Sequence, residues 1–257
     1  MMKVVLAVPV RNEYEIEEFI KGIEEVLQQS GNKLVRIILA VNNSEQKFID
    51  LIDKLAKHKK EVKAIQLGSL GDKTFAYAYL SALKEASVED ADVVVEVDAG
   101  GSFSSKDIPR LISLIDGKDA VFSNRFTHSG RLHNIYGHSL SRKALSAFGT
   151  VSANLLLRLG RYVPDMTSGL SAVRKDTLIE LFENSPRLEN WVSVSTVGHF
   201  FQTEYRTRLL WLSPKIAILN ISMGNGKVRK SQKFKPEMIT KSLKALYLLA
   251  TTKKNTN

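Results

Sequence analysis

The stretch Asp92-Val93-Val94-Val95-Glu96-Val97-Asp98-Ala99-Gly100-Gly101-Ser102 decides how this chain is expected to fold. Its run of β-branched residues is typical of a strand buried on both faces of a parallel sheet. In open α/β sheets, ligands bind just outside the carboxyl ends of the strands, and Asp98 stands at such an end. The glycines after it would let a ligand approach the backbone closely. The alternative is that Asp98 only caps the turn that follows.

Strand patterns alternate with amphipathic helix patterns through most of the chain. Strands are expected at residues 3–8, 34–41, 62–67, 93–97, 120–123 and 215–222. This alternation predicts an α/β fold with a mostly parallel sheet and helices on both of its faces. We expect one domain over residues 1–222, followed by a basic loop and an amphipathic helix over residues 223–257.

For two helices the sequence predicts a specific detail: the N-cap of the first helix and the inward face of a later one. Asn12 is a plausible N-cap for the helix after the first strand, with Glu15 at the capping-box position. The pattern of residues 140–158 predicts a helix whose apolar side chains face the core. These side chains are Leu145, Phe148, Val151, Leu155 and Leu156.

The amino-acid composition indicates which classes of partner are expected and which are excluded. The formal net charge is +10, which favours anionic partners. There is no cysteine, so disulfides and thiolate metal sites are excluded, and a cytoplasmic location is expected. No nucleic-acid partner is expected, because the basic tail lacks interleaved aromatic residues and no known binding motif is present.

The last helix has two interpretations. From Lys227 to Lys254 the chain holds nine Lys or Arg residues against one acid, Glu237. A basic amphipathic helix can lie on an anionic membrane surface, which would make the protein peripheral on the inner face of a membrane. Alternatively, Leu243, Leu246 and Leu249 pack on the domain and the lysines face solvent.

Polar residues follow four of the expected strands. They lie at Pro9 to Glu13, Asn42 to Ser44, Gly71 to Lys73 and Asp98 to Ser102. Parallel topology brings these ends to one edge, where asparagines can read a base and Arg11 and Lys73 can face phosphates. Asp98 can bind a ribose hydroxyl or a metal on a diphosphate. No phosphate-cradling Gly-Lys-Ser/Thr loop and no GxGxxG motif is present, which argues against an ATPase and a dinucleotide dehydrogenase.

At these residues the chain resembles the family 2 glycosyltransferases with the GT-A (Rossmann-like) fold, and among them the dolichyl- or polyprenyl-phosphate sugar synthases. The resemblance covers about residues 3 to 233. The stretches that carry it are Val8 to Glu13, Val41 to Ser44, Gly71 to Ala82, Val94 to Gly101, Asp107 to Leu111, Ser123 to Phe126, Asp165 to Arg174, Phe201 to Glu204 and Gly226 to Ser231.

The resemblance implies a nucleotide-sugar donor and a lipid-phosphate or glycan acceptor, used by an inverting transferase. It implies that the nucleotide pocket is lined by Pro9, Arg11 and Glu13, with Asn43 or Asn42 at the base. Asp98 would be the first carboxylate of the Asp-X-Asp motif that holds Mg²⁺ or Mn²⁺. Residues near the sugar, the acceptor and the phosphate groups would be Arg125, Ser168, Gly169, Arg174, Lys227, Arg229 and Lys230.

Glu204 would flank the acceptor, and a hydroxyl acceptor would need a carboxylate base, for which Glu204 and Asp165 are candidates. Each also has a structural alternative: Glu204 as a salt-bridged helix residue and Asp165 as a turn residue.

The sequence also departs from the family pattern. Gly100 replaces the second Asp of the motif, and Asn42-Asn43 replaces an acidic pair. Leu170 and Ser171 stand where the family has an aromatic residue and an arginine. A metal held by Asp98 alone would be weakly bound or dispensable. The alternative function is a non-catalytic homologue that binds a nucleotide or glycan.

Overall fold

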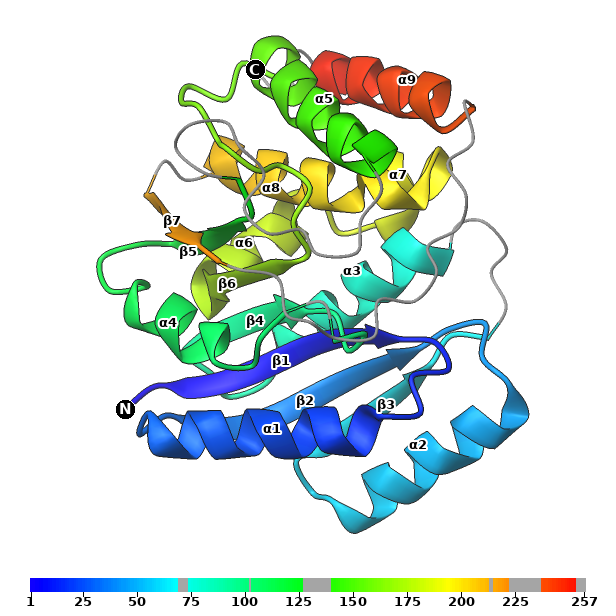
Figure 1. Cartoon of the computed structure of the whole chain (residues 1–257), viewed down its shortest axis with the longest axis vertical. Helices are drawn as coiled ribbons and strands as arrows, with labels where there is room; N and C mark the ends of the chain where they lie inside the picture. The colour runs from blue at the N-terminus through cyan, green and yellow to red at the C-terminus, as the bar shows by residue number, and fades with distance from the viewer. Residues whose placement is uncertain (69–73, 102, 127–139, 213–214, 222–236, 253–257) are drawn as a thin grey trace.

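The computed structural model describes residues 1–68, 74–101, 103–126, 140–212, 215–221 and 237–252 (Figure 1). These residues form a seven-stranded sheet in the order β3-β2-β1-β4-β6-β5-β7. The strands are β1 (Lys3–Val10), β2 (Lys33–Val41), β3 (Val62–Gln66), β4 (Val93–Val97), β5 (Ala120–Asn124), β6 (Leu170–Arg174) and β7 (Ile216–Asn220). The α-helices are α1 (Ile16–Gln29), α2 (Gln46–His58), α3 (Thr74–Ala86), α4 (Asp107–Ser113), α5 (Leu140–Leu156), α6 (Lys175–Asn184), α7 (Val192–Ser195), α8 (Phe201–Leu212) and α9 (Glu237–Thr252). The 3₁₀ helices η2 (Leu188–Asn190) and η3 (Gly198–Phe200) flank α7.

Helices cover both faces of the sheet, as predicted. One apolar core joins one face of β1, β2 and β4 to helices α1, α2 and α4. The other core joins the opposite face to α3, α6, α7 and α8, with α5 and α9 packed at its outer side (Figure 1). The strand pattern explains this division, because successive side chains of a strand point to opposite faces.

The central strands follow the predicted pattern closely. β4 spans Val93–Val97 with all five residues buried, because it lies between β1 and β6. β1 runs two residues further than predicted, through Pro9 and Val10, which pair with β2. Its pairing with β4 stops at Ala7, so Pro9 lies beyond the part of β1 that is paired on both sides. A residue without an amide hydrogen is tolerated at such a position.

One strand runs against the others. β6 is antiparallel to both β4 and β5, with Leu170 opposite Val97 and Arg174 opposite Val93. The amino end of β6 therefore meets the carboxyl ends of its neighbours. This reversal decides which residues of the stretch from Gly169 to Arg174 lie near Asp98.

Helix α5 is turned the opposite way from the prediction. Its apolar side chains are exposed at Phe148, Val151, Leu155 and Leu156, while Thr150, Ala153 and the adjacent Leu157 are buried. The side chain of Leu145 is outside the described part. The prediction of an inward apolar face was wrong, because hydrogen bonds between Thr150 or Asn154 and the following loop hold the polar face inward.

Helix α9 shows the expected burial of a packed helix. Ala245, Leu246 and Leu249 are buried, and α9 contacts α5 and α7. Leu243 remains 40% exposed, and Lys241 and Lys244 face solvent. Of the two interpretations of this helix, packing on the domain therefore holds for Leu246 and Leu249. Among the described helices, none is long and apolar enough to cross a membrane.

Candidate active site

Asp98 lies directly after β4 and is partly exposed at the carboxyl edge of the sheet. Its carboxylate accepts a hydrogen bond from the hydroxyl of Tyr79 on α3. A Cβ atom added to Gly169 would lie 3.0 Å from Oδ2 of Asp98 and 3.5 Å from the Tyr79 hydroxyl. A side chain at position 169 would crowd the Asp98 carboxylate, which glycine avoids. The resemblance implied that Gly169 lies near the sugar and the acceptor, and this role stays a prediction.

The sequence reasoning missed Tyr79 and Gln202 as members of this cluster. Tyr79 is fully buried and stacks on Phe201, with 4.7 Å between ring centroids. Burial and the negative charge of Asp98 raise the pKa of Tyr79 well above its usual value, so its hydroxyl stays a hydrogen-bond donor. A hydrogen bond with Gln202 opposes this shift. A tyrosine rather than a phenylalanine at a buried helix position is a signal for such a partner.

Arg125, just beyond β5, is held by several partners. Nε donates to Oδ2 of Asp165 at 2.7 Å and Nη2 donates to Oδ1 at 2.9 Å. Nη2 also donates to Ser146 of α5 and to Thr167. Burial lowers the pKa of Arg125, but the charges of Asp165 and then Asp98 raise it above its usual value. Within the described residues, Nη1 is the one guanidinium nitrogen left without a partner.

A second arginine, Arg206, joins three segments of the site by hydrogen bonds. Arg206 of α8 is fully buried and donates to the backbone carbonyls of Ser123, Asp165 and Leu170. Burial lowers its pKa to about 10, against the charges of Asp165 and Glu96. Glu96 of β4 is buried beside it, and burial raises its pKa to about 7. Arg206 therefore connects the end of β5, the loop before β6 and the start of β6.

The ends of β1 and β2 form the other side of the site. Arg11 and Asn43 are exposed, whereas Asn42 is buried, so Asn43 is the more accessible of the two asparagines. The backbone amide of Arg11 donates to Glu13. Pro9 is partly buried at the end of β1.

The predicted N-cap at Asn12 was wrong. Helix α1 begins at Ile16 and has no side-chain cap. Oδ1 of Asn12 instead accepts a bond from the amide of Glu45, ahead of α2, at 2.9 Å. Asn12 has a backbone φ of 57°, a left-handed conformation that asparagine tolerates. It therefore joins the loops after β1 and β2.

Glu204 has a structural environment. It is fully buried on α8, and its carboxylate accepts bonds from the amides of Val192 and Ser193 at 3.0 and 2.7 Å. Arg208 lies 2.8 Å from the same carboxylate. These contacts anchor the start of α7 and favour the salt-bridged interpretation over a catalytic base.

Arg174 lies away from the site, so its predicted acceptor role was wrong. It stands at the carboxyl end of β6, opposite Val93. Because β6 is antiparallel, this end lies at the edge of the sheet opposite to Asp98. Its guanidinium donates to the carbonyls of Lys118 and Ile115.

The remaining predicted residues divide into two groups. Ser168 is fully buried, and its Oγ lies 2.5 Å from Oγ of Ser123, so it braces the loop beneath Gly169. Lys73, Lys227, Arg229 and Lys230 lie outside the described residues.

The described residues do not form a metal site by themselves. No group of three or more His, Asp or Glu side chains comes together among them in a way that could hold an ion. Asp98 stands where the resemblance places a ligand, but its partner position is Gly100. A Cβ on Gly100 would meet nothing within 4 Å, so packing does not forbid a carboxylate there.

Comparison with solved structures supports the fold. Glucosyl-3-phosphoglycerate synthase from Mycobacterium tuberculosis, solved with Mn²⁺, uridine diphosphate and phosphoglyceric acid, superposes with a TM-score of 0.58. The match covers 97% of this chain and 78% of that chain at 16% identity. At this identity the likeness concerns the fold alone, and it confirms the predicted GT-A architecture.

Sequence comparison gives the family. The chain is 28% identical over 145 residues to an undecaprenyl-phosphate mannosyltransferase of Micrococcus luteus, covering 56% of this chain and 54% of the relative. It is 26% identical over 134 residues to a polyprenol monophosphomannose synthase of Mycolicibacterium smegmatis, covering 52% and 46%. The chain thus matches about half the length of these relatives. The model of "Glycosyl transferase family 2" matches residues 5–182, and the chain therefore belongs to glycosyl transferase family 2.

Proposed function

We propose that this protein transfers a sugar from a nucleoside diphosphate sugar to a polyprenyl phosphate, with inversion at the anomeric carbon. Membership of glycosyl transferase family 2 supports the sugar transfer. The names of the two curated relatives support a polyprenyl phosphate acceptor. The nucleotide lies across the ends of β1, β2 and β4, with Arg11 and Asn43 exposed toward it and Asp98 beside its diphosphate.

The observation that supports a phosphate acceptor is the environment of the two candidate bases, Glu204 and Asp165. Glu204 is fully buried and bound to two backbone amides and Arg208. Asp165 is buried, and although burial raises its pKa, the ion pair with Arg125 brings it below the usual value. Neither carboxylate is placed to take a proton from a hydroxyl. A phosphate acceptor needs no base, because its oxygen is already anionic.

The reaction then takes one displacement. An oxygen of the acceptor phosphate forms a bond to the anomeric carbon while the bond from that carbon to the nucleoside diphosphate breaks. The electron pair of the broken bond leaves with the diphosphate. Nη1 of Arg125 binds the acceptor phosphate, and Asp165, Ser146 and Thr167 hold the guanidinium in place.

The requirement for Mg²⁺ or Mn²⁺ is proposed to be weak. Asp98 is the only carboxylate in the motif, since Gly100 takes the second position. Mg²⁺ tolerates a site with one carboxylate, several waters and substrate phosphates. Affinity for the ion without nucleotide is expected to be low, and the proposed displacement does not depend on the ion.

A product assay tests the proposal. The purified protein is incubated with a panel of UDP-, GDP- and dTDP-sugars and a short polyprenyl phosphate, and the lipid is analysed by mass spectrometry. We expect one nucleotide family to yield a glycosyl phosphate lipid, with no product from the matching polyprenol. Binding of a nucleotide without product from any pair would favour the non-catalytic homologue. Product from the free polyprenol would contradict the assignment of the acceptor.

A further inference from the structure

Exposed apolar side chains concentrate on one part of the surface. Of the eleven large hydrophobic residues that are exposed in the described part of the chain, seven lie on α5, the loop after it, and α9. They are Phe148, Val151, Leu155, Leu156, Tyr162, Leu243 and Tyr247. We call this set the α5–α9 surface. Helices α5 and α9 contact each other at the outer side of the molecule (Figure 1).

Hydrogen bonds on the opposite face of α5 fix its apolar face outward. Asn154 accepts a bond from the amide of Val163 at 2.7 Å and donates to its carbonyl at 2.8 Å. Oγ1 of Thr150 accepts from the amide of Met166 at 3.2 Å. The polar face of α5 therefore holds the loop that carries Asp165. Rotating the helix to bury Leu155 would break these bonds.

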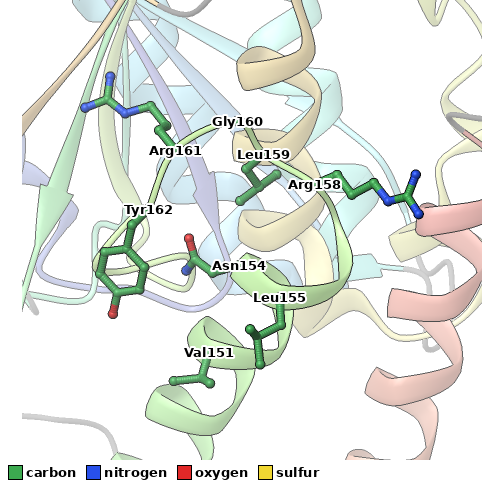
Figure 2. A pocket seen from close by; sticks show the side chains of 8 residues that line it. All are labelled: Val151, Asn154, Leu155, Arg158, Leu159, Gly160, Arg161 and Tyr162. Atoms are coloured by element: carbon green, nitrogen blue, oxygen red, sulfur yellow. The ribbon is translucent and has the colours of Figure 1, made fainter.

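A hollow of about 380 Å³ lies at the carboxyl end of this helix (Figure 2). Val151 and Leu155 of α5 line it together with Leu159 and Tyr162 from the following loop. Arg158 stands at its rim and extends toward α9 in Figure 2. The surface thus combines apolar walls with an adjacent cation.

The charge around this surface is mainly positive. Residues 140–164 contain four basic residues and no acidic residue. Helix α9 adds the exposed Lys241 and Lys244 against Glu237. Two copies of this surface facing each other would bring like charges together, which disfavours self-association. An apolar face with flanking cations is complementary to an anionic lipid surface.

We propose that the α5–α9 surface docks on an anionic lipid bilayer, with the apolar side chains of α5 at the boundary of the acyl chains. Arg158, Lys241 and Lys244 contact the lipid phosphates. The inward face of the same helix holds Arg125 through Ser146, so docking sets the candidate acceptor side close to the lipid surface. The proposal deepens the proposed function, on which it rests for the lipid acceptor, but vesicle binding can be measured without turnover.

The test is co-sedimentation with vesicles of phosphatidylcholine, with or without about one-third phosphatidylglycerol. We expect binding to the anionic vesicles that weakens with salt. The double variant Phe148→Ser/Leu155→Ser should lower the partition coefficient about tenfold or more, because it removes apolar surface that enters the bilayer. Lys241→Ala/Lys244→Ala should lower it by a smaller factor and reduce its salt dependence.

The matched control is Val88→Ser/Leu114→Ser, which removes exposed apolar side chains elsewhere and should leave partitioning unchanged. Equal partitioning of the α5 variant and wild type would overturn the proposal, as would absence of wild-type binding to anionic vesicles. A wild-type dimer that the α5 variant converts to a monomer would also overturn it in favour of a protein interface. Nucleotide-induced thermal shifts, measured in parallel, report on the proposed function separately.

Discussion

The two sides of the candidate site differ in how their charges are held. On the proposed nucleotide side, at the ends of β1 and β2, Arg11 and Asn43 are exposed to solvent. On the proposed acceptor side, formed by the end of β5, the start of β6 and α8, Asp165 and Arg206 are buried and bonded to several groups. Exposed groups on the first side are accessible to a ligand. Groups on the second side are fixed by contacts within the fold.

This difference separates residues whose main role is ligand binding from residues whose main role is to stabilise the fold. A buried ion pair adds little net stability, but removing one partner leaves an uncompensated charge and is costly. An exposed polar residue has no such penalty. Changes on the acceptor side should therefore act first on folding, and changes on the nucleotide side should act first on binding.

The largest effect is expected for Asp165→Ala. The change leaves the largely buried Arg125 without its ion-pair partner, so the free energy of unfolding should fall by about 3–5 kcal/mol. Urea denaturation measures it, with the exposed Asp176→Ala as the control that should change stability little. A loss of activity at wild-type stability would mean that Asp165 acts in the chemistry instead.

Next comes Gly169→Ala, compared with Gly100→Ala. A Cβ at 169 would lie 3.0 Å from Asp98, whereas a Cβ at 100 would meet nothing within 4 Å. Displacement of the carboxylate should lower turnover about 100-fold for Gly169→Ala, since small misplacements in a site have effects of this size. Gly100→Ala should stay near wild type. Equal turnover of the two variants would remove Asp98 from the reaction.

Glu204→Gln should affect stability more than catalysis. The neutral amide keeps one acceptor but loses charge-assisted bonds to the amides of Val192 and Ser193, so unfolding should become easier by about 1–3 kcal/mol. Turnover of the folded variant, measured below its melting temperature, should match wild type. A variant of normal stability with strongly reduced turnover would restore Glu204 as a base.

The smallest effect on folding is expected for Asn43→Gly on the nucleotide side. Asn43 has a φ of 42°, which glycine adopts without strain. Stability should remain within about 0.5 kcal/mol. The dissociation constant for the nucleotide should rise by roughly tenfold, because a base-contacting amide is lost. Calorimetric titration measures this, and an unchanged constant would place the base elsewhere.

The central sheet could be predicted because its strands are buried on both faces. The run from Val93 to Val97 is apolar except for Glu96, so its pattern and its bounds agree with the structure. The reversed direction of β6 could not be predicted, since an apolar run of five residues carries no sign of its direction. The resemblance implied that Arg174 lies near the acceptor, whereas the reversal of β6 places it at the far edge of the sheet.

The burial of polar side chains was the other feature that the sequence could not predict. A helix pattern indicates that one face is apolar, but it does not say which face is covered. On α5 the hydrogen bonds of Thr150 and Asn154 decide the direction. Arg206 and Glu204 on α8 are buried because backbone groups of distant segments surround them. Such partners become visible only when the fold brings them together.

The most direct test of the account is nucleotide binding by wild type and Asp98→Asn. Thermal shifts would be measured with UDP, GDP, CMP and dTDP and their sugars, each with Mg²⁺, Mn²⁺ or EDTA. We expect that one nucleotide family stabilises wild type, that EDTA removes only part of the shift, and that Asp98→Asn loses the metal-dependent part. Absence of a shift with every nucleotide, or an identical metal-dependent shift in Asp98→Asn, would contradict it.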